Sequence, residues 1–585
     1  MASSFFYKIE KSKCGLDTLT INNISIHSKF NPNNEADNFI YEGKNLILIF
    51  GIGLGYHIKN ILKNNSNSIF IIYEPISTIL SLYKEKYGDF DILNNSNILI
   101  LDVIDNNLIY DFLYKHTFYD DKRILYYQNL GYKTLFNDSS LYFYQSIKDI
   151  FKILKQNILT DSYFLPVWTK NFFINSTKLE KCKLLNIEKI GKTKLENLAV
   201  IASAGPSLNN DLPILREVRE KVTIFAVDTA YKTLLKAKVI PDFVVSLDSQ
   251  FFSLDDFPFI ENSEIKENSK TAFIFDLTSY PKVSTLYKNS YFLSTINFFE
   301  ETIVKDFFNN FKINIEKIST GGTITDYTLD FVLKLGFNNV FFSGLDLSFP
   351  NFITHSKNSP FSDKYLSSSC YTDTIDTLMI KNIHDRNLSK VESKTNETLY
   401  SDFILQNYGS YIKDYVSFYK DKNIWTTFQN GIHIDGIVSI KLEELIAKLK
   451  TNRILSGEII NNNLITNNLI SIDEVKIRDY YQNLFSKLYN LSQKLKEWIS
   501  SLDNIEKEDS IDKNENRLYE EAIKEILLKS DLYFPFLEKF LIISKVNFDN
   551  AVKDNKNFYK DVAIYLLQFI YFLIRNLQKL LSHFN

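Results

Sequence analysis

Residues 198–211 read LAVIASAGPSLNND, and this stretch decides the fold of the largest part of the chain. An apolar run has the pattern of a buried strand, Gly205 and Pro206 then break it, and a helical pattern begins at Leu208. Strands that alternate with helices in this way form a mainly parallel sheet with helices on both faces. We therefore predict an α/β, doubly wound, Rossmann-like domain. Further apolar runs lie at 222–227, 243–247, 271–275 and 339–343, with helical patterns at 208–219 and 323–335.

The N-terminal region shows a second alternation of the same kind. An apolar run at 45–50 leads into GIGLG at 51–55, an amphipathic stretch to Leu62 and a second run at 68–73, which ends at Glu74. This order predicts another Rossmann-like domain, with more strands at 98–104 and 123–127. GIGLG resembles the cofactor loop of S-adenosylmethionine methyltransferases, in which Glu74 would suit a ribose hydroxyl. The alternative is a structural turn, which the absence of an accompanying catalytic residue favours.

The strand pattern disappears after about residue 440. Leu484, Leu488, Leu491, Leu495 and Trp498 recur at helical spacing and predict one helix face. The apolar stretch 562–574 is interrupted by Gln568 and is too short to cross a bilayer, so it predicts a buried helix, while the charged stretch 503–517 predicts a loop. The three predicted domains are 1–160, Rossmann-like; 161–440, nucleotide-sugar-binding and catalytic; and 441–585, α-helical.

Composition limits the classes of function. The 585 residues carry a net charge of −3 with 45% hydrophobic residues, as in soluble multidomain proteins, and no basic excess favours nucleic acid. Cys14, Cys182 and Cys370 have no spacing for a disulfide framework or a zinc site. The N-terminus lacks the apolar core of a signal peptide. We expect a cytoplasmic protein that does not insert into membranes.

Polar residues follow several strands of the predicted central domain. Ser207 stands near a helix N-terminus, Asp228 and Asp248 end the next two strands, and Asp346 follows a later strand. The carboxyl ends of parallel strands share one crevice, so these side chains are expected to converge there, and a helix N-terminus favours phosphate. The alternative reading is that each residue only caps a helix.

The order of the motifs carries a family resemblance. GPSL, VDTA, PDFVVSLDSQ, TGGT, GLDLSF, THSKNS and TTFQNGIHIDGI follow one another between residues 205 and 437. This series resembles the motility accessory factor (Maf) family of flagellated bacteria. The resemblance implies transfer of a nonulosonic acid, pseudaminic or legionaminic, from a CMP-activated donor to Ser or Thr of flagellin, which would be the partner.

GPSL and SGLD also resemble segments of bacterial sialyltransferases, and that likeness implies roles by position. Gly205, Pro206 and Ser207 would lie along the nucleotide, and Asp228 and Thr229 would lie near its ribose or base. Thr320, Gly321 and Gly322 would surround a phosphate or carboxylate. Asp248 would face the donor as a catalytic candidate. The implied donor-binding residues are Gly205, Pro206, Ser207, Asp228, Thr229, Thr320, Gly321, Gly322, Gly344 and Asp346.

His355, in the polar loop THSKNSP, is the candidate base. Histidine is the side chain best suited to accept a proton near neutral pH, and sialyltransferases of this type use a histidine. The alternative is a solvated loop histidine, and His433 is the second histidine to consider. Protein donors can stabilise the single phosphate of a CMP-sugar, so no metal or cofactor is predicted. Asp228 and Asp248 could still hold Mg²⁺.

Two other functions stay open. Archaeal relatives of the central domain transfer pyrophosphate from ATP to a hydroxymethyl pterin, with Mg²⁺ between the phosphates. The large helical region would also suit a non-catalytic adaptor or chaperone for flagellin. The sequence does not distinguish the particular sugar, the acceptor residues or the oligomeric state.

Overall fold

The computed structural model describes residues 5–41, 45–66, 68–88, 90–116, 123–180, 184–185, 194–257, 271–287, 289–294, 303–314, 318–395, 397–427, 431–449, 452–454, 469–505, 558–582 and 584. The chain forms two compact units, residues 1–162 and 163–585. The C-terminal helices therefore belong to the same unit as the large sheet. Helix α6 (Asn137–Ser176) runs from the first unit into the second.

The first unit contains a parallel sheet in the order β6-β5-β4-β7. β4 (Leu46–Phe50) lies in the interior of the sheet, and all five of its residues are buried, as a continuous apolar run requires. The strand order reverses beside β4, because β5 and β6 lie on one side of it and β7 lies on the other. GIGLG directly follows β4 and therefore lies at this switch point. The other strands are β5 (Ile69–Tyr73), β6 (Ile98–Leu101) and β7 (Ile124–Gln128), and an antiparallel sheet joins β1 (Tyr7–Lys11), β2 (Asp17–Ile21) and β3 (Ile24–Ser25).

Short helices connect these strands. The amphipathic stretch after GIGLG forms α1 (Tyr56–Asn64), which buries His57, Ile58 and Ile61. The others are η1 (Pro32–Asn34), α2 (Ser77–Leu82), η2 (Tyr83–Tyr87), α3 (Phe90–Leu93), α4 (Asn106–Lys115) and α5 (Leu130–Leu135).

The second unit is built on one large sheet, in the order β18-β17-β14-β9-β10-β11-β12-β13-β8-β19. Every pairing is parallel except β19 with β8. The strands are β8 (Leu184–Leu185), β9 (Leu195–Ala202), β10 (Thr223–Val227), β11 (Phe243–Ser246), β12 (Ala272–Asp276), β13 (Ser290–Leu293), β14 (Phe337–Ser343), β17 (Asn423–Thr426), β18 (Val438–Ser439) and β19 (Leu469–Ile470). The hairpin β15 (Leu388–Glu392) and β16 (Thr398–Asp402) stands apart.

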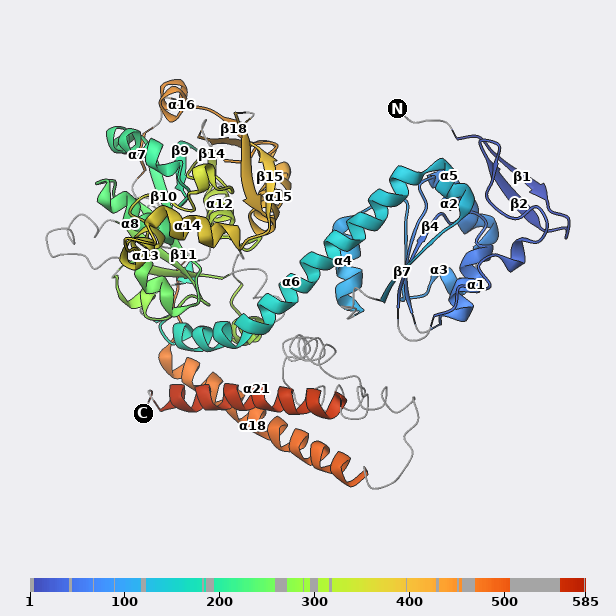
Figure 1. Cartoon of the computed structure of the whole chain (residues 1–585). Coiled ribbons are helices and arrows are strands. Elements are labelled where there is room, and N and C mark those ends of the chain that lie inside the picture. Colours follow the sequence, from blue (N-terminus) through green and yellow to red (C-terminus); the bar gives the residue numbers. More distant parts are fainter. Residues whose placement is uncertain are drawn as a thin grey trace. The chain divides into compact units, whose positions relative to one another are not determined.

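Helices cover both faces of this sheet (Figure 1). They are α7 (Leu208–Glu217), η4 (Arg219–Lys221), α8 (Asp228–Lys236), η5 (Phe251–Asp256), η6 (Val283–Thr285), α11 (Ile303–Asn310), α12 (Ile324–Lys334), η7 (Pro350–Phe352), α13 (Pro360–Ser368), α14 (Ile375–His384), α15 (Phe403–Phe418) and α16 (Leu442–Leu449).

Two long C-terminal helices lie side by side (Figure 1), namely α18 (Glu474–Ile505) and α21 (Phe558–Leu581). Their apolar faces enter the core that also holds Phe172 and Phe307. Tyr481 of α18 contacts Phe173 edge-on, and its hydroxyl hydrogen-bonds with Ser176. Among the described residues, no helix is long and apolar enough to cross a membrane.

The predicted fold class is confirmed. The nine predicted strands all exist, and 562–574 forms part of a buried helix. The first three residues of the predicted loop 503–517 are helical instead, because α18 continues to Ile505. Residues 506–517 lie outside the described part of the chain.

Candidate functional site

The strand order of the second unit reverses beside β9. From β9 the chain continues through β10 to β13 on one side, whereas β14, β17 and β18 lie on the other. Ligands of open α/β sheets bind at the carboxyl ends of strands at such a point. The loops after β9 and β14, which carry GPSL and GLD, meet there. Ser203 N–H donates to Ser343 O over 2.8 Å, and Gly205 N–H donates to Gly344 O over 3.0 Å.

The two glycines are required by this contact between loops. A Cβ on Gly205 would lie 2.4 Å from Gly344 O, and one on Gly344, whose φ is +80°, would lie 2.2 Å from Ser203 O. Neither position has room for a side chain. The sequence predicted close approach of Gly205 to a nucleotide, but its close neighbours in the structure are Gly344 and Asp346. Substituting this glycine would therefore disturb the loops themselves.

Asp346 and Ser207 meet where these two loops converge. Asp346 Oδ2 accepts the backbone N–H of Ser207 over 2.7 Å, and both residues are buried. Among the described residues, neither Asp346 Oδ1 nor Ser207 Oγ has a hydrogen-bond partner. Buried polar groups normally have partners, so these atoms are available to a ligand. Desolvation raises the pKa of Asp346.

The His355 loop packs against the same place. Ser356 N–H donates to Ala204 O over 2.8 Å, and Lys357 N–H donates to Asn209 Oδ1 over 3.1 Å. The His355 ring stacks on Phe361, with ring centres 4.1 Å apart. Burial, with the nearby Arg386 charge, lowers the pKa of His355 to about 4. The ring is therefore partly covered and neutral at pH 7, in contrast to a solvated loop histidine.

Two more buried polar atoms in this loop have no hydrogen-bond partner among the described residues. They are His355 Nδ1 and Thr354 Oγ1. His433 differs, since it is exposed and lies 3.3 Å from Asp435 in an ion-pair geometry. His355 is thus the histidine that the fold places beside GPSL.

The sequence reasoning missed Lys394 and Asp211, which lie behind Asp346. The Lys394 ammonium donates to Thr426 Oγ1 over 3.0 Å and to Leu345 O over 3.3 Å, and it is close enough to both carboxyl groups to interact with them electrostatically. Burial lowers the pKa of Lys394 to about 8 and raises that of Asp211 to about 6. Asp211 could have been found, because it lies one helical turn after Ser207. Lys394 lies in the turn of the hairpin between β15 and β16, and no sequence motif marks it.

A second polar group lies beyond β10 and β11. Asp228 is buried and accepts bonds from Ser246 Oγ over 2.8 Å and from Thr229 N–H over 2.7 Å. Burial raises the pKa of Asp228 to about 6. Asp248 is exposed at the end of β11. Burial, reinforced by Asp228 and Asp248, raises the pKa of Asp256 to about 9, so Asp256 is a neutral hydrogen-bond donor at pH 7. The sequence reasoning had not singled out Asp256.

The TGGT loop is satisfied internally. The buried Asp326 carboxylate accepts from Thr320 Oγ1 over 2.8 Å and from Gly321 N–H over 3.1 Å. It also accepts the N–H of Thr323 over 3.3 Å, while Gly322 N–H donates to Thr320 Oγ1. Asp326 thus occupies the position that the prediction gave to a phosphate or carboxylate of the donor.

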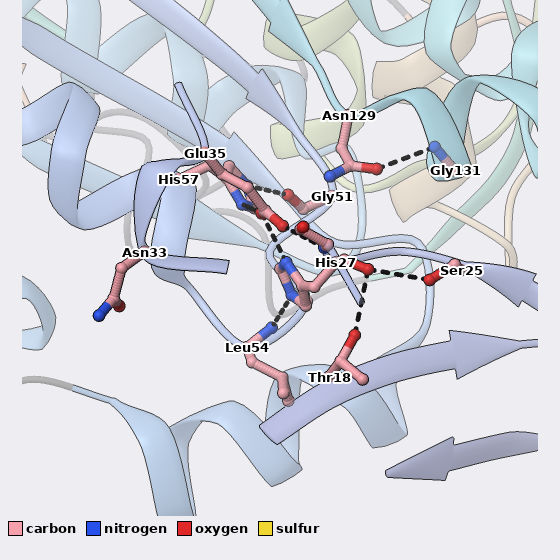
Figure 2. Close-up of polar contacts among 12 residues, drawn as sticks. Thr18, Ser25, His27, Asn33, Glu35, Gly51, Leu54, His57, Asn129 and Gly131 are labelled. Carbon is pink, nitrogen blue, oxygen red and sulfur yellow. Dashed lines mark hydrogen bonds and ion pairs between the residues drawn. The ribbon is translucent and has the colours of Figure 1, made fainter. Parts of the chain in front are cut away.

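The GIGLG loop of the first unit is satisfied in the same way. Glu74, fully buried, accepts from Ile52 N–H over 2.8 Å and from the Tyr132 hydroxyl over 2.5 Å. Leu54 N–H donates to His27 Nε2 over 2.7 Å (Figure 2). The sequence suggested that Glu74 could bind the ribose of a cofactor, but its carboxyl group binds the loop itself. This arrangement favours the interpretation of GIGLG as a structural turn.

We expect Glu74→Gln to lower the free energy of unfolding by about 1–3 kcal/mol, because the amide nitrogen would face donors such as Ile76 N–H or Ile52 N–H. Chemical denaturation of the full chain would measure this. Glu85→Gln, on the exposed side of η2, is the matched control and should change stability by less than about 0.5 kcal/mol. Equal stability of the wild-type protein, Glu74→Gln and Glu85→Gln would contradict the structural role of Glu74.

Two units built on parallel sheets, the second with buried polar groups at its switch point, define an α/β protein with two Rossmann-like units. Residues 15–84 match the glycosyltransferase Maf N-terminal domain, and residues 170–352 match the family described as 6-hydroxymethylpterin diphosphokinase MptE-like. The structure of a Maf glycosyltransferase from Magnetospirillum magneticum AMB-1 is similar over 99% of this chain and 92% of that one, with a TM-score of 0.63 and 13% identity. The predicted resemblance to the Maf family is thereby confirmed: residues 15–84 match the Maf N-terminal domain, and the chain shares the fold of this Maf structure.

A shorter relative also matches. An uncharacterized protein of Treponema pallidum (strain Nichols) is 32% identical over 107 residues. The match covers 17% of this chain and 47% of that protein, so the chain spans about half the length of this curated relative.

Proposed function

We propose that the chain is a glycosyltransferase that moves a nonulosonic acid, of the pseudaminic or legionaminic type, from a CMP-activated donor to Ser or Thr of flagellin. This modification would serve flagellum assembly and motility. The Maf fold and N-terminal domain support transferase chemistry. The observation that carries the proposal is a group of buried polar atoms that have no hydrogen-bond partner in the described part of the chain: Ser207 Oγ, Asp346 Oδ1, Thr354 Oγ1 and His355 Nδ1.

The chemistry of these atoms suggests which part of the donor each of them would bind. Asp346 Oδ1 accepts hydrogen bonds and repels phosphate, so it suits a ribose hydroxyl or the cytosine amino group. Ser207 and Thr354 can donate from their hydroxyls, which suits the phosphate or the sugar carboxylate. Lys394 balances the charge of Asp346 and Asp211 from behind.

The reaction would be a single displacement at the anomeric carbon. The acceptor hydroxyl oxygen forms the new bond to that carbon, and the bond from the carbon to the phosphate oxygen breaks, so CMP leaves. The hydroxyl proton passes to His355 Nδ1, which is neutral and has a free lone pair if the other ring nitrogen carries the hydrogen. The exposed Asp248 would contact the sugar or the acceptor at the edge of the crevice.

Serine variants test the donor site. Ser207→Ala should weaken CMP binding by about 10-fold or more, since a hydrogen bond to a charged group contributes about 1.5–3 kcal/mol. Stability should stay unchanged, because this hydroxyl has no partner among the described residues. Ser290→Ala is the matched control: this buried hydroxyl donates to Tyr287 O over 2.8 Å, so its loss should cost about 1 kcal/mol of stability and no CMP affinity. Calorimetric titration and thermal melts measure both, and unchanged affinity in Ser207→Ala would refute the placement.

The MptE-like match and the carboxyl groups of Asp228 and Asp248 favour a second candidate, an ATP-dependent diphosphokinase that uses Mg²⁺. Titrating CMP and ATP, each with and without Mg²⁺, separates the candidates. Metal-independent CMP binding supports the transferase, Mg²⁺-dependent ATP binding supports the kinase, and binding of neither supports a non-catalytic flagellin adaptor.

A further inference from the structure

Three side chains from separate segments of the first unit converge beside GIGLG (Figure 2). His27 follows β3, Glu35 follows η1, and His57 lies in the first turn of α1. One ligand atom from each lies within 4.8 Å of the other two. Glu35 Oε2 is 2.7 Å from His27 Nδ1 and 3.9 Å from His57 Nδ1. Tetrahedral Zn²⁺ holds such atoms at about 2.0–2.2 Å, hence roughly 3.4 Å apart. The observed separations lie on either side of that value.

His57 has the orientation of a metal ligand. Its Nε2–H donates to the carbonyl of Gly51 over 2.9 Å, which leaves Nδ1 without a hydrogen. A backbone carbonyl fixes metal-binding histidines in the same way. His57 is completely buried, and Nδ1 has no hydrogen-bond partner among the described residues. Its lone pair instead faces the Glu35 carboxylate, at a distance too long for a shared proton. A cation between these two atoms would satisfy both.

We propose that His27 Nδ1, Glu35 Oε2 and His57 Nδ1 bind one Zn²⁺ ion, with water as the fourth ligand. Two imidazoles and one carboxylate suit zinc, whereas Mg²⁺ and Ca²⁺ prefer all-oxygen sites. Both histidine side chains are inaccessible, but the Glu35 side chain is 14% exposed and gives water access. This proposal does not depend on the glycosyltransferase function.

Binding changes the tautomer of His27. Its Nε2 accepts the N–H of Leu54 over 2.7 Å, so the neutral, metal-free ring carries hydrogen on Nδ1 and donates it to Glu35. Histidine binds zinc as a neutral imidazole, so this hydrogen moves to Nε2 when zinc occupies Nδ1, and the bond from Leu54 N–H is given up. Zinc requires neutral histidines and an ionised carboxylate, so its affinity should fall as the pH falls.

The ion would connect three parts of the first unit. His27 ends the small antiparallel sheet, Glu35 accepts the N–H of Ser28 over 2.6 Å, and His57 is bonded to the first residue of GIGLG. A bound cation would therefore hold the N-terminal sheet against the glycine loop. Its role would be structural, since the site is buried and the loop N–H groups are already bonded.

The full chain is first dialysed against a chelator and then titrated with ZnCl₂ by calorimetry, with MgCl₂ as the comparison ion. We expect one Zn²⁺ per chain, a higher melting temperature with zinc, no response to Mg²⁺, and a Co²⁺ absorption spectrum of tetrahedral type. Glu35→Gln and His57→Ala should each weaken zinc by at least about 100-fold, because even outer-shell changes cost about 10–100-fold. His384→Ala, at an exposed histidine, is the control and should bind as wild type does.

Two results would overturn the site. Wild-type protein that binds no zinc and shows no melting shift would exclude it without reference to any variant. Wild-type affinity in either Glu35→Gln or His57→Ala would place the zinc elsewhere on the chain. If His57→Ala does not fold, Glu35→Gln alone decides, because this partly exposed side chain can be replaced by one of equal size.

Discussion

Alanine in place of His355 is expected to lower the single-turnover rate of sugar transfer by about 10²–10⁴-fold at saturating donor, the usual cost of losing a general base. CMP affinity should remain nearly intact, because the proton acceptor acts on the attacking hydroxyl. The position favours this role: His355 Nδ1 has no partner among the described residues, and its loop is bonded to Ala204 beside GPSL. His384→Ala and His433→Ala, at exposed histidines, are the controls and should retain the wild-type rate.

The pH dependence gives an independent readout. A base with a pKa of about 4 is already deprotonated at pH 6, so the rate should rise through pH 4 and then stay level. The free energy of unfolding should also depend on pH for the same reason. Between about pH 4 and 6.5 the unfolded chain binds a proton at His355 that the folded chain does not, so stability falls as the pH falls. His355→Ala should reduce that slope without removing it, because burial also lowers the pKa of His57 to about 4.

Three outcomes are distinguishable. A loss of rate with normal affinity supports the base. A parallel loss of CMP affinity would instead make His355 a contact of the donor phosphate. Wild-type turnover would remove it from the mechanism and direct attention to Asp248.

The strands were predictable because both parallel sheets bury continuous apolar runs. β4, β10 and β14 are completely buried, and their ranges differ from the predicted ones by no more than two residues at either end. The prediction missed the small antiparallel sheet β1–β3 and the hairpin β15–β16, and it also missed five short strands of the large sheet, β8, β13, β17, β18 and β19. β1 and β15 are mainly exposed and charged, so they lack the apolar signal on which the prediction relied.

The candidate site was only partly predictable. Sequence places GPSL and GLD at strand ends, and parallel topology then brings them together. It cannot show how polar groups pair across the fold. The donors of the TGGT and GIGLG loops are taken by Asp326 and Glu74, which lie three residues after TGGT and 19 residues after GIGLG. The same limit applies to Lys394 and to the convergence of His27, Glu35 and His57. Such contacts depend on tertiary packing between segments that carry no motif.

The C-terminal helices were predicted as a separate domain, yet their packing implies that the second unit cannot fold without them. Thirteen of their side chains are at most 4% exposed within the core shared with Phe172 and Phe307: Ile477, Tyr481, Leu484, Leu488, Leu491, Leu495, Val562, Ala563, Leu566, Phe569, Ile570, Leu573 and Leu577. Truncating one large side chain of this kind to alanine typically costs about 2–5 kcal/mol. Removing all of them exceeds the 5–15 kcal/mol that stabilises a typical domain.

A chain that ends at residue 449 is therefore expected to lose the cooperative melting transition of the second unit, and CMP binding with it, as circular dichroism and calorimetry would show. Two single substitutions on α18, one at a buried and one at an exposed position, test whether the shared core stabilises the second unit. Leu491→Ala, at a buried position, should cost about 2–5 kcal/mol, whereas Tyr489→Ala, which is 50% exposed, should cost little. A truncated chain that melts cooperatively and binds CMP would show that α18 and α21 are dispensable. Because deletion is expected to unfold the unit, a role of these helices in capturing flagellin is better tested by substituting exposed residues such as Val475 and Tyr489, which leave the shared core intact.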